Sequence, residues 1–227
     1  MKPNAYLERL YRHRFSDQQR ASKTRLWQVL IDHFLQKYVK EDADVLDIGG
    51  GYGEFINHIA AKGKYLIDLN PDARAFAAPD VKVWNVNIAD PASQRELGVP
   101  FDIIFISNFF EHLNSKEALL HVLIFCFEHL KAGGSLLIIQ PNFKYAFREY
   151  YDFIDHQLPI THLSLQELLQ TVGFTIDLLI PRFLPYSTKG RPASPQLLRL
   201  YLKLPVVWRF VGGQMFIKAS RPLSLER

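Results

Sequence analysis

The chain has 227 residues, of which 48% are hydrophobic and 22% are charged, and its formal net charge is +4. This composition is that of a globular domain with one full core, and it excludes disordered and fibrous proteins. The mild positive charge is compatible with an acidic substrate or a membrane surface. The basic residues are scattered rather than clustered, so no nucleic-acid partner is favoured.

The chain carries one cysteine, Cys126, inside an apolar helical run, so we expect a buried structural thiol and no internal disulfide. The N-terminus shows no apolar signal region. The longest apolar stretch, residues 118–127, is too short to span a bilayer. We expect a cytoplasmic protein without a transmembrane segment, and peripheral contact with the inner membrane face stays open.

Strand and helix patterns alternate along most of the chain. A capping box at residues 16–19 predicts an amphipathic helix, and residues 1–40 are expected to form an N-terminal helical cap. Further helices are expected after the glycine-rich segment through Ile59, from Pro71, from Pro91, from Asn114 to Leu130, and from Ser164 to Gly173. The expected strands are Val45–Ile48, Lys64–Asp68, Val81–Val86, Phe101–Ser107, Gly134–Gln140, Phe174–Ile180 and Gln214–Ala219.

This alternation predicts the fold class α/β, with a seven-stranded, mostly parallel sheet and helices on both faces. In such sheets ligands bind beyond the carboxyl ends of the strands. Two connections at that edge are unusually long, Pro141–Leu163 and Pro181–Gly213, and we expect them to form lids or substrate sites.

The most informative segment is residues 45–55, where an apolar strand ends and glycine recurs at Gly49, Gly51 and Gly53. Glycines let a backbone pass close to a ligand, which indicates a cofactor of nucleotide type. A dinucleotide fingerprint also needs glycine at its sixth position, where this chain has Glu54 or Ile56, depending on the frame. The dinucleotide interpretation therefore fails.

This glycine loop and four later segments resemble class I S-adenosylmethionine-dependent methyltransferases. The later segments are residues 64–68, 101–113, 130–139 and 164–174, in the family's order, with Ala132 where the family has proline. The resemblance covers about residues 42–180. It implies a Rossmann-like sheet whose last strand is antiparallel, a methyltransferase core at residues 41–180, and a lid insertion with the final strand at residues 181–227.

The resemblance also implies residue roles around S-adenosyl-L-methionine. The glycine-loop residues would line the methionine part, Asp47 would hold the ammonium group, and Asp68 would accept hydrogen bonds from the ribose hydroxyls. Asp90 precedes Pro91 and is interpreted as a helix cap instead. The implied cofactor-binding residues are Asp47, Gly49, Gly50, Gly51, Tyr52, Gly53, Asp68, Leu69, Asn87, Ile88, Ser107 and Asn108.

Methyl transfer from a sulfonium is an in-line displacement, and an oxygen nucleophile also needs a base. Histidine has a suitable ordinary pKa, so the candidate bases are His156, which follows an aspartate, and also His162 and His112. We expect no metal ion. Tyr151, Arg182 and Lys189, in the two long connections, are the expected substrate contacts. The later part of the second connection is an amphipathic lid, a dimer face or an interfacial helix.

The segment at residues 150–156 and the turn at residues 183–186 also resemble a bacterial methyltransferase group linked with surface-polysaccharide biosynthesis. That resemblance implies methylation of a sugar hydroxyl on a phosphate-linked (nucleotide-linked) or lipid-linked glycan, and a small-metabolite hydroxyl is the other acceptor we expect. The alternatives are a protein or RNA methyltransferase and a non-catalytic cofactor-binding partner subunit. Methylation of a base amine is disfavoured, because residues 107–110 lack the prolines typical of that activity. The sequence does not predict an oligomeric state.

Overall fold

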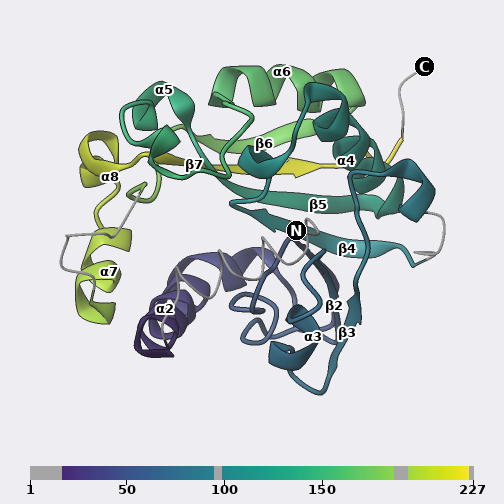
Figure 1. Ribbon diagram of the computed structural model, residues 1–227, viewed down its shortest axis with the longest axis horizontal. Coiled ribbons are helices and arrows are strands. Elements are labelled where there is room, and N and C mark those ends of the chain that lie inside the picture. The colour runs from purple at the N-terminus through teal and green to yellow at the C-terminus, as the bar shows by residue number, and fades with distance from the viewer. Residues whose placement is uncertain (1–16, 95–98, 187–193, 225–227) are drawn as a thin grey trace.

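The computed structural model describes residues 17–94, 99–186 and 194–224. Seven strands form one sheet in the order β3-β2-β1-β4-β5-β7-β6 (Figure 1). The neighbouring strands run parallel except β7, which is antiparallel to both β5 and β6. The strands are β1 (Asp44–Ile48), β2 (Gly63–Ile67), β3 (Val81–Trp84), β4 (Phe101–Ser107), β5 (Leu130–Pro141), β6 (Thr175–Ile180) and β7 (Gln214–Ser220). The expected fold class, with an antiparallel last strand, is confirmed.

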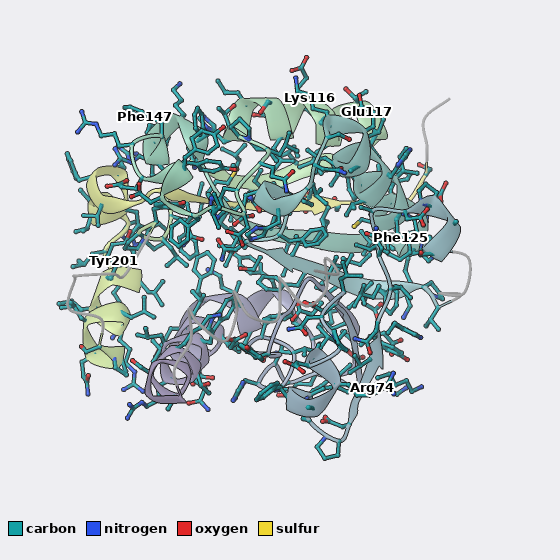
Figure 2. The ribbon with its side chains drawn as sticks, in the orientation of Figure 1. Arg74, Lys116, Glu117, Phe125, Phe147 and Tyr201 are labelled. Atoms are coloured by element: carbon teal, nitrogen blue, oxygen red, sulfur yellow. The ribbon has the colours of Figure 1, made fainter. Side chains whose placement is uncertain are left out.

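Helices cover both faces of the sheet, with α4 and α6 on one face and α2 on the other (Figure 1). Phe125 on α4 and Tyr201 on α7 lie near opposite ends of the molecule (Figure 2). The helices and helical turns are α2 (Asp17–Leu30), η1 (Ile31–Leu35), η2 (Gln36–Tyr38), α3 (Ala73–Phe76), η3 (Pro91–Gln94), η4 (Phe110–His112), α4 (Lys116–His129), α5 (Phe143–Ala146), η5 (Tyr150–Asp152), α6 (His162–Val172), α7 (Pro195–Leu202) and α8 (Pro205–Val211).

Alternating strand residues divide the core into two apolar clusters. In β1, Leu46 and Ile48 pack with α4 and α6, whereas Val45 faces the cluster that contains α2. This alternation follows from the two-residue period of a strand. Cys126 is fully buried in the first cluster, as expected, and burial raises the pKa of its thiol. That thiol is therefore a packing group rather than a nucleophile.

The expected helix through Ile59 is wrong, because residues 51–59 form a series of turns. Two polar side chains stabilise the turns in place of a regular helix. Asn57 donates from Nδ2 to the Phe76 carbonyl and accepts from the Ala78 amide, while His58 Nδ1 lies 3.0 Å from the Glu54 carbonyl oxygen. The His58 contact occupies the carbonyl that a regular helix would pair with the His58 amide, and this amide donates to the Phe55 carbonyl instead.

Helix starts were predicted less well than strands. α6 begins at His162 rather than after Ser164, because Thr161 is its N-cap and Ser164 is the partner in the capping box. Gly173 ends this helix with φ +115°, as expected. α3 begins at Ala73, two residues later than predicted, and the capping box expected at residues 16–19 begins outside the described residues.

The two long connections contain short helices that cover the carboxyl edge of the sheet. The first includes α5 and η5, and the second includes α7 and α8. α7 packs beside α2, which joins the second connection to the N-terminal part of the described chain (Figure 1). In the part of the chain that is described, no helix is both long and apolar enough to cross a membrane.

Ser115 caps α4 by accepting a hydrogen bond from the Ala118 amide at 3.1 Å. Ser115→Ala should lower the free energy of unfolding by about 1 kcal/mol, because the amide loses its partner. Urea unfolding followed by circular dichroism measures the change. Ser115→Asp is the matched control and should unfold like the wild type; equal midpoints for all three proteins would remove the cap as a stabilising contact.

Candidate functional site

The turn after β1 depends on backbone conformations that favour glycine. Gly49, Gly51 and Gly53 have φ values of +70°, +57° and +76°. A Cβ at Gly49 would lie 2.5 Å from the ring of Phe109, whereas no atom lies within 4 Å of the Cβ position at Gly51. Gly49 is therefore required for close packing as well as conformation, and the space beside Gly51 is open to a ligand.

A first pocket of about 500 Å³ lies at the carboxyl ends of β1, β2 and β4. Six residues expected to bind the cofactor line it together: Gly49, Asp68, Leu69, Asn87, Ile88 and Asn108. Its wall is completed by the exit loop of β4 and by residues of the first long connection, which include Ile154, Asp155 and Gln157. Pockets of this size, mostly apolar with a few polar groups, are typical of cofactor sites.

Asp68 is fixed at the floor of this pocket. Its Oδ2 accepts from the Gly51 amide at 2.8 Å, and its Oδ1 accepts from the Asn70 amide at 2.7 Å. Burial raises the pKa of this carboxyl. Each carboxylate oxygen accepts about two hydrogen bonds, so Asp68 keeps capacity for a vicinal diol.

Asp47 carries the least compensated charge of the site. Its side chain is 2% exposed, and its Oδ1 has no hydrogen-bond partner among the described residues. Burial, followed by the nearby Glu54 and Asp68 carboxylates, raises the pKa of Asp47 well above its ordinary value. Lys23 pairs with Glu54 at 2.8 Å rather than with Asp47. This surplus of negative charge fits a cationic group such as an ammonium.

A second pocket, of about 470 Å³, lies between α2, α7 and the start of β7. Asn108 lines both pockets, so the two meet at the end of β4. Asn108 has φ +48°, and its side chain donates to Ser107 Oγ, which also lines the second pocket. Tyr201, labelled on α7 in Figure 2, forms part of the wall.

Two of the three candidate bases lie together near both pockets. The His112 and His156 rings are 5.2 Å apart, and His112 Nδ1 lies 3.3 Å from Asp155 Oδ2. His156 Nδ1 lies 3.3 Å from the hydroxyl of Tyr186, which lines the second pocket. Glu111 is buried below them, where burial raises the pKa of its carboxyl. Glu111, His112 and His156 are close enough together to hold a metal ion, although none was expected.

Other predicted site residues lie away from the two pockets. His162 is buried, its Nδ1 lies 2.9 Å from Asn142 Nδ2, and burial lowers the pKa of its imidazole. Arg182 donates to the carbonyls of Gly212 and Phe210 at the end of α8. Tyr151 is 59% exposed and lines neither pocket, and Lys189 lies outside the described residues.

Several cofactor-binding predictions concern residues beneath or beside the first pocket. Asp47, Gly50, Gly51, Tyr52 and Gly53 belong to the β1 turn but do not line that pocket. Tyr52 packs edge-on against Phe76 of α3. The cofactor-binding roles of these residues stay predictions. The open space at Gly51 and the unpaired Asp47 oxygen are the observations that favour these roles.

The sequence predicts a lid or substrate site in the second long connection, and this connection supplies much of the wall of the second pocket. Sequence reasoning gave no ligand role to the α2 residues, yet Trp27 and Leu30 both line the pocket. Tyr186 and Gln214 stand at the two ends of the second long connection. For Tyr186 the sequence offered one indication: it is an aromatic residue in a connection that leaves a strand at the ligand-binding edge of the sheet, directly after Leu184 and Pro185.

Comparison with known proteins was made for sequence and for structure. A sequence-family model described as "Methyltransferase domain" matches residues 12–179. No curated protein matches the chain in sequence. Among solved structures, a SAM-dependent methyltransferase from Archaeoglobus fulgidus is 23% identical, with a TM-score of 0.65 over 87% of this chain and 94% of the other.

Two further structures share the fold at lower identity. A SAM-dependent methyltransferase from Methanosarcina mazei is 19% identical, with a TM-score of 0.58 over 84% of this chain and 97% of the other. The N-methyltransferase NodS from Bradyrhizobium japonicum, in complex with S-adenosyl-L-homocysteine, is 14% identical, with a TM-score of 0.56 over 90% of this chain and 87% of the other.

The raised pKa of Asp47 predicts that the free energy of unfolding of the ligand-free protein depends on pH. Between the ordinary value of 3.8 and the raised value, the folded state binds more protons than the unfolded state. Stability should therefore fall as pH rises through this window and then level off. Asp47→Asn removes this contribution, so its melting temperature should rise relative to that of the wild type as the pH increases from 4 to 7.

Differential scanning calorimetry across this range measures the gain. Asp42→Asn, at an exposed position before β1, is the matched control and should track the wild type at every pH. A constant difference between Asp47→Asn and the wild type would mean that Asp47 is not a strained buried carboxylate.

Proposed function

The chain belongs to the methyltransferase-domain family, and from this premise we propose that it transfers a methyl group from S-adenosylmethionine to a hydroxyl of a small molecule held in the second pocket. The observation that carries the proposal is the pair of pockets that meet at Asn108, with the buried Asp47 carboxyl, one oxygen of which has no partner among the described residues, near the first. The family, and solved structures of this fold, indicate S-adenosylmethionine as the methyl donor.

We place the adenosine in the first pocket and the methionine over the glycine turn. Asp68 would bind the ribose hydroxyls, and Asn87 with the Ile88 amide would contact the adenine, since all three line one cavity. The ammonium would lie near Asp47, whose buried oxygen lacks a donor. A cation there would offset the charge that raises the pKa of this carboxyl.

S-adenosylmethionine supplies a methyl group on a sulfonium, which is already activated for displacement. A new oxygen–carbon bond forms as the carbon–sulfur bond breaks, the electron pair of that bond returns to sulfur, and the acceptor proton goes to a base. The protein contributes alignment and exclusion of water. Asn108 stands between the two pockets, at the place where the nucleophile and the methyl group must meet.

We propose that the proton leaves through Tyr186 to His156. Tyr186 lines the acceptor pocket, and its hydroxyl lies 3.3 Å from His156 Nδ1. Burial raises the pKa of Tyr186, which keeps its hydroxyl neutral and able to pass a proton rather than hold a charge. His112, which packs against His156, is the second choice. His162 is less suitable, because it is buried against Asn142 and lines neither pocket.

The alternative readings differ in acceptor or in activity. The sequence resemblance favours a sugar or small-metabolite hydroxyl, and NodS, which shares the fold, is an N-methyltransferase. A protein or RNA acceptor and a non-catalytic cofactor-binding subunit remain the competing proposals. A non-catalytic subunit would bind cofactor yet transfer no methyl group.

The purified protein should bind S-adenosylhomocysteine in isothermal titration calorimetry. Asp68→Ala should weaken that binding by about 1.5–3 kcal/mol, roughly tenfold to more than a hundredfold, because charged hydrogen bonds are lost. Asp90→Asn is the control: Asp90 accepts from the Ala92 amide as a cap, and asparagine caps equally well. Unchanged affinity in a folded Asp68→Ala protein would refute the ribose placement, and no binding to the wild type would refute the cofactor.

His156→Ala should leave S-adenosylhomocysteine affinity unchanged and reduce methyl transfer by about 10²–10⁴-fold, which is the usual contribution of a general base. Transfer of a tritiated methyl group to fractionated cell extract measures this loss. Tyr186→Phe should show a loss of the same kind. His121→Ala, on α4 and outside both pocket walls, is the control. Full activity in His156→Ala would eliminate this histidine as the base.

A further inference from the structure

The residues that line the second pocket indicate the chemical class of the molecule that binds there. We propose that the acceptor is an apolar small molecule, and not a glycan, that carries one hydrogen-bond donor in addition to the hydroxyl to be methylated. This inference rests on the proposed function for its catalytic meaning. The prediction of which molecules bind depends on the properties of the pocket alone.

The wall of the second pocket is mostly aromatic and aliphatic. It draws these side chains from α2, β5, the segment that follows β6, α7 and the end of α8. The apolar and aromatic lining residues are Leu26, Trp27, Leu30, Ile139, Leu184, Pro185, Tyr186, Leu197, Leu198, Tyr201 and Val211. The volume of about 470 Å³ is that of a small-molecule site.

Most polar groups of the wall already bond to other protein groups. The Tyr201 hydroxyl donates to the Phe183 carbonyl, and burial raises the pKa of Tyr201 to about 12. Among the described lining residues Lys23 is the one cation, and its ammonium is paired with Glu54 at 2.8 Å. A glycan would bring several hydroxyls into this wall and leave most of them without partners, which is costly.

Gln214 is the exception, and it indicates what the occupant must offer. Its Nε2 donates to the Pro185 carbonyl at 3.0 Å, while its Oε1 is buried and has no partner among the described residues. The orientation of the amide is fixed by this contact, since a flipped amide would place two oxygens together. A buried acceptor without a donor, in a residue that lines an apolar pocket, calls for one donor on the ligand.

The pocket is also placed for the reaction. Ser107 and Asn108, at the end of β4, line it at the junction with the first pocket. Leu197 and Val211 belong to its wall and are 49% and 41% exposed, so the pocket has an apolar entrance from solvent. An apolar acceptor would enter there and reach the methyl donor at Asn108.

The test uses 2-naphthol as a probe with one donor, 2-methoxynaphthalene as the same skeleton without it, and methyl glucoside as a polar probe. Calorimetry should show that 2-naphthol binds the wild type at least tenfold more tightly than 2-methoxynaphthalene. Methyl glucoside should not bind. Equal affinities for the two naphthalenes would overturn the role of Gln214, and binding of the glucoside but not of 2-naphthol would overturn the acceptor class.

Leu26→Trp fills the pocket from α2 and should weaken 2-naphthol binding at least tenfold. Leu163→Trp, the same change at a 55% exposed position on α6, should leave it unchanged. S-adenosylhomocysteine affinity should be the same in both variants. Unaltered naphthol binding in a folded Leu26→Trp protein would place the probe elsewhere and refute the site.

The two proposals fail in different ways. If the wild type binds S-adenosylhomocysteine but not 2-naphthol, the acceptor inference is wrong and the methyltransferase proposal stands. If it binds 2-naphthol but not S-adenosylhomocysteine, the apolar pocket stands and the methyltransferase proposal is wrong.

Discussion

The site is organised around one buried negative charge. Asp47 is the penultimate residue of β1, which lies between β2 and β4 in the sheet, and it is buried. A Cβ at Gly50 would lie 2.4 Å from Asp47 Oδ2, so glycine is required where the turn crosses the carboxylate. Lys23 pairs with Glu54. Above its raised pKa the Asp47 carboxylate therefore destabilises the folded protein, and a bound cationic ligand would offset this effect.

Asn108 lies where two pockets with chemically different walls meet. Asp68 and Asn87 contribute polar groups to the wall of the first pocket, whereas Trp27 and Leu30 contribute apolar surface to the wall of the second. A positive φ at Asn108 turns the chain sharply after β4, which is how one residue reaches both cavities. Specificity for the methyl donor and for the acceptor can therefore be set by separate sets of residues.

The sequence predicted the strands well because each is a short apolar run ending in a turn residue, as in Phe101–Ser107, where the expected and observed bounds agree. The cofactor loop was recognisable because its glycines are close in sequence. The turn series at residues 51–59 was missed, because the sequence does not show that His58 pairs with the Glu54 carbonyl or that Asn57 bonds to the distant Phe76 and Ala78. The contribution of α2 to the second pocket was missed for the same reason, since Trp27 and Gln214 meet only through tertiary packing.

The second long connection leaves and rejoins the sheet at a single point. Gly213 donates to the Leu184 carbonyl at 2.8 Å, and Phe183 donates to the Gln214 carbonyl at 2.6 Å. A segment closed at its base in this way can be lengthened at small entropic cost, about 0.6 kcal/mol for each doubling of length. Leu202 and Trp208 anchor its helices in the core cluster that contains α2, so a graft that keeps these anchors would change the wall of the second pocket and leave the wall of the first pocket as it is.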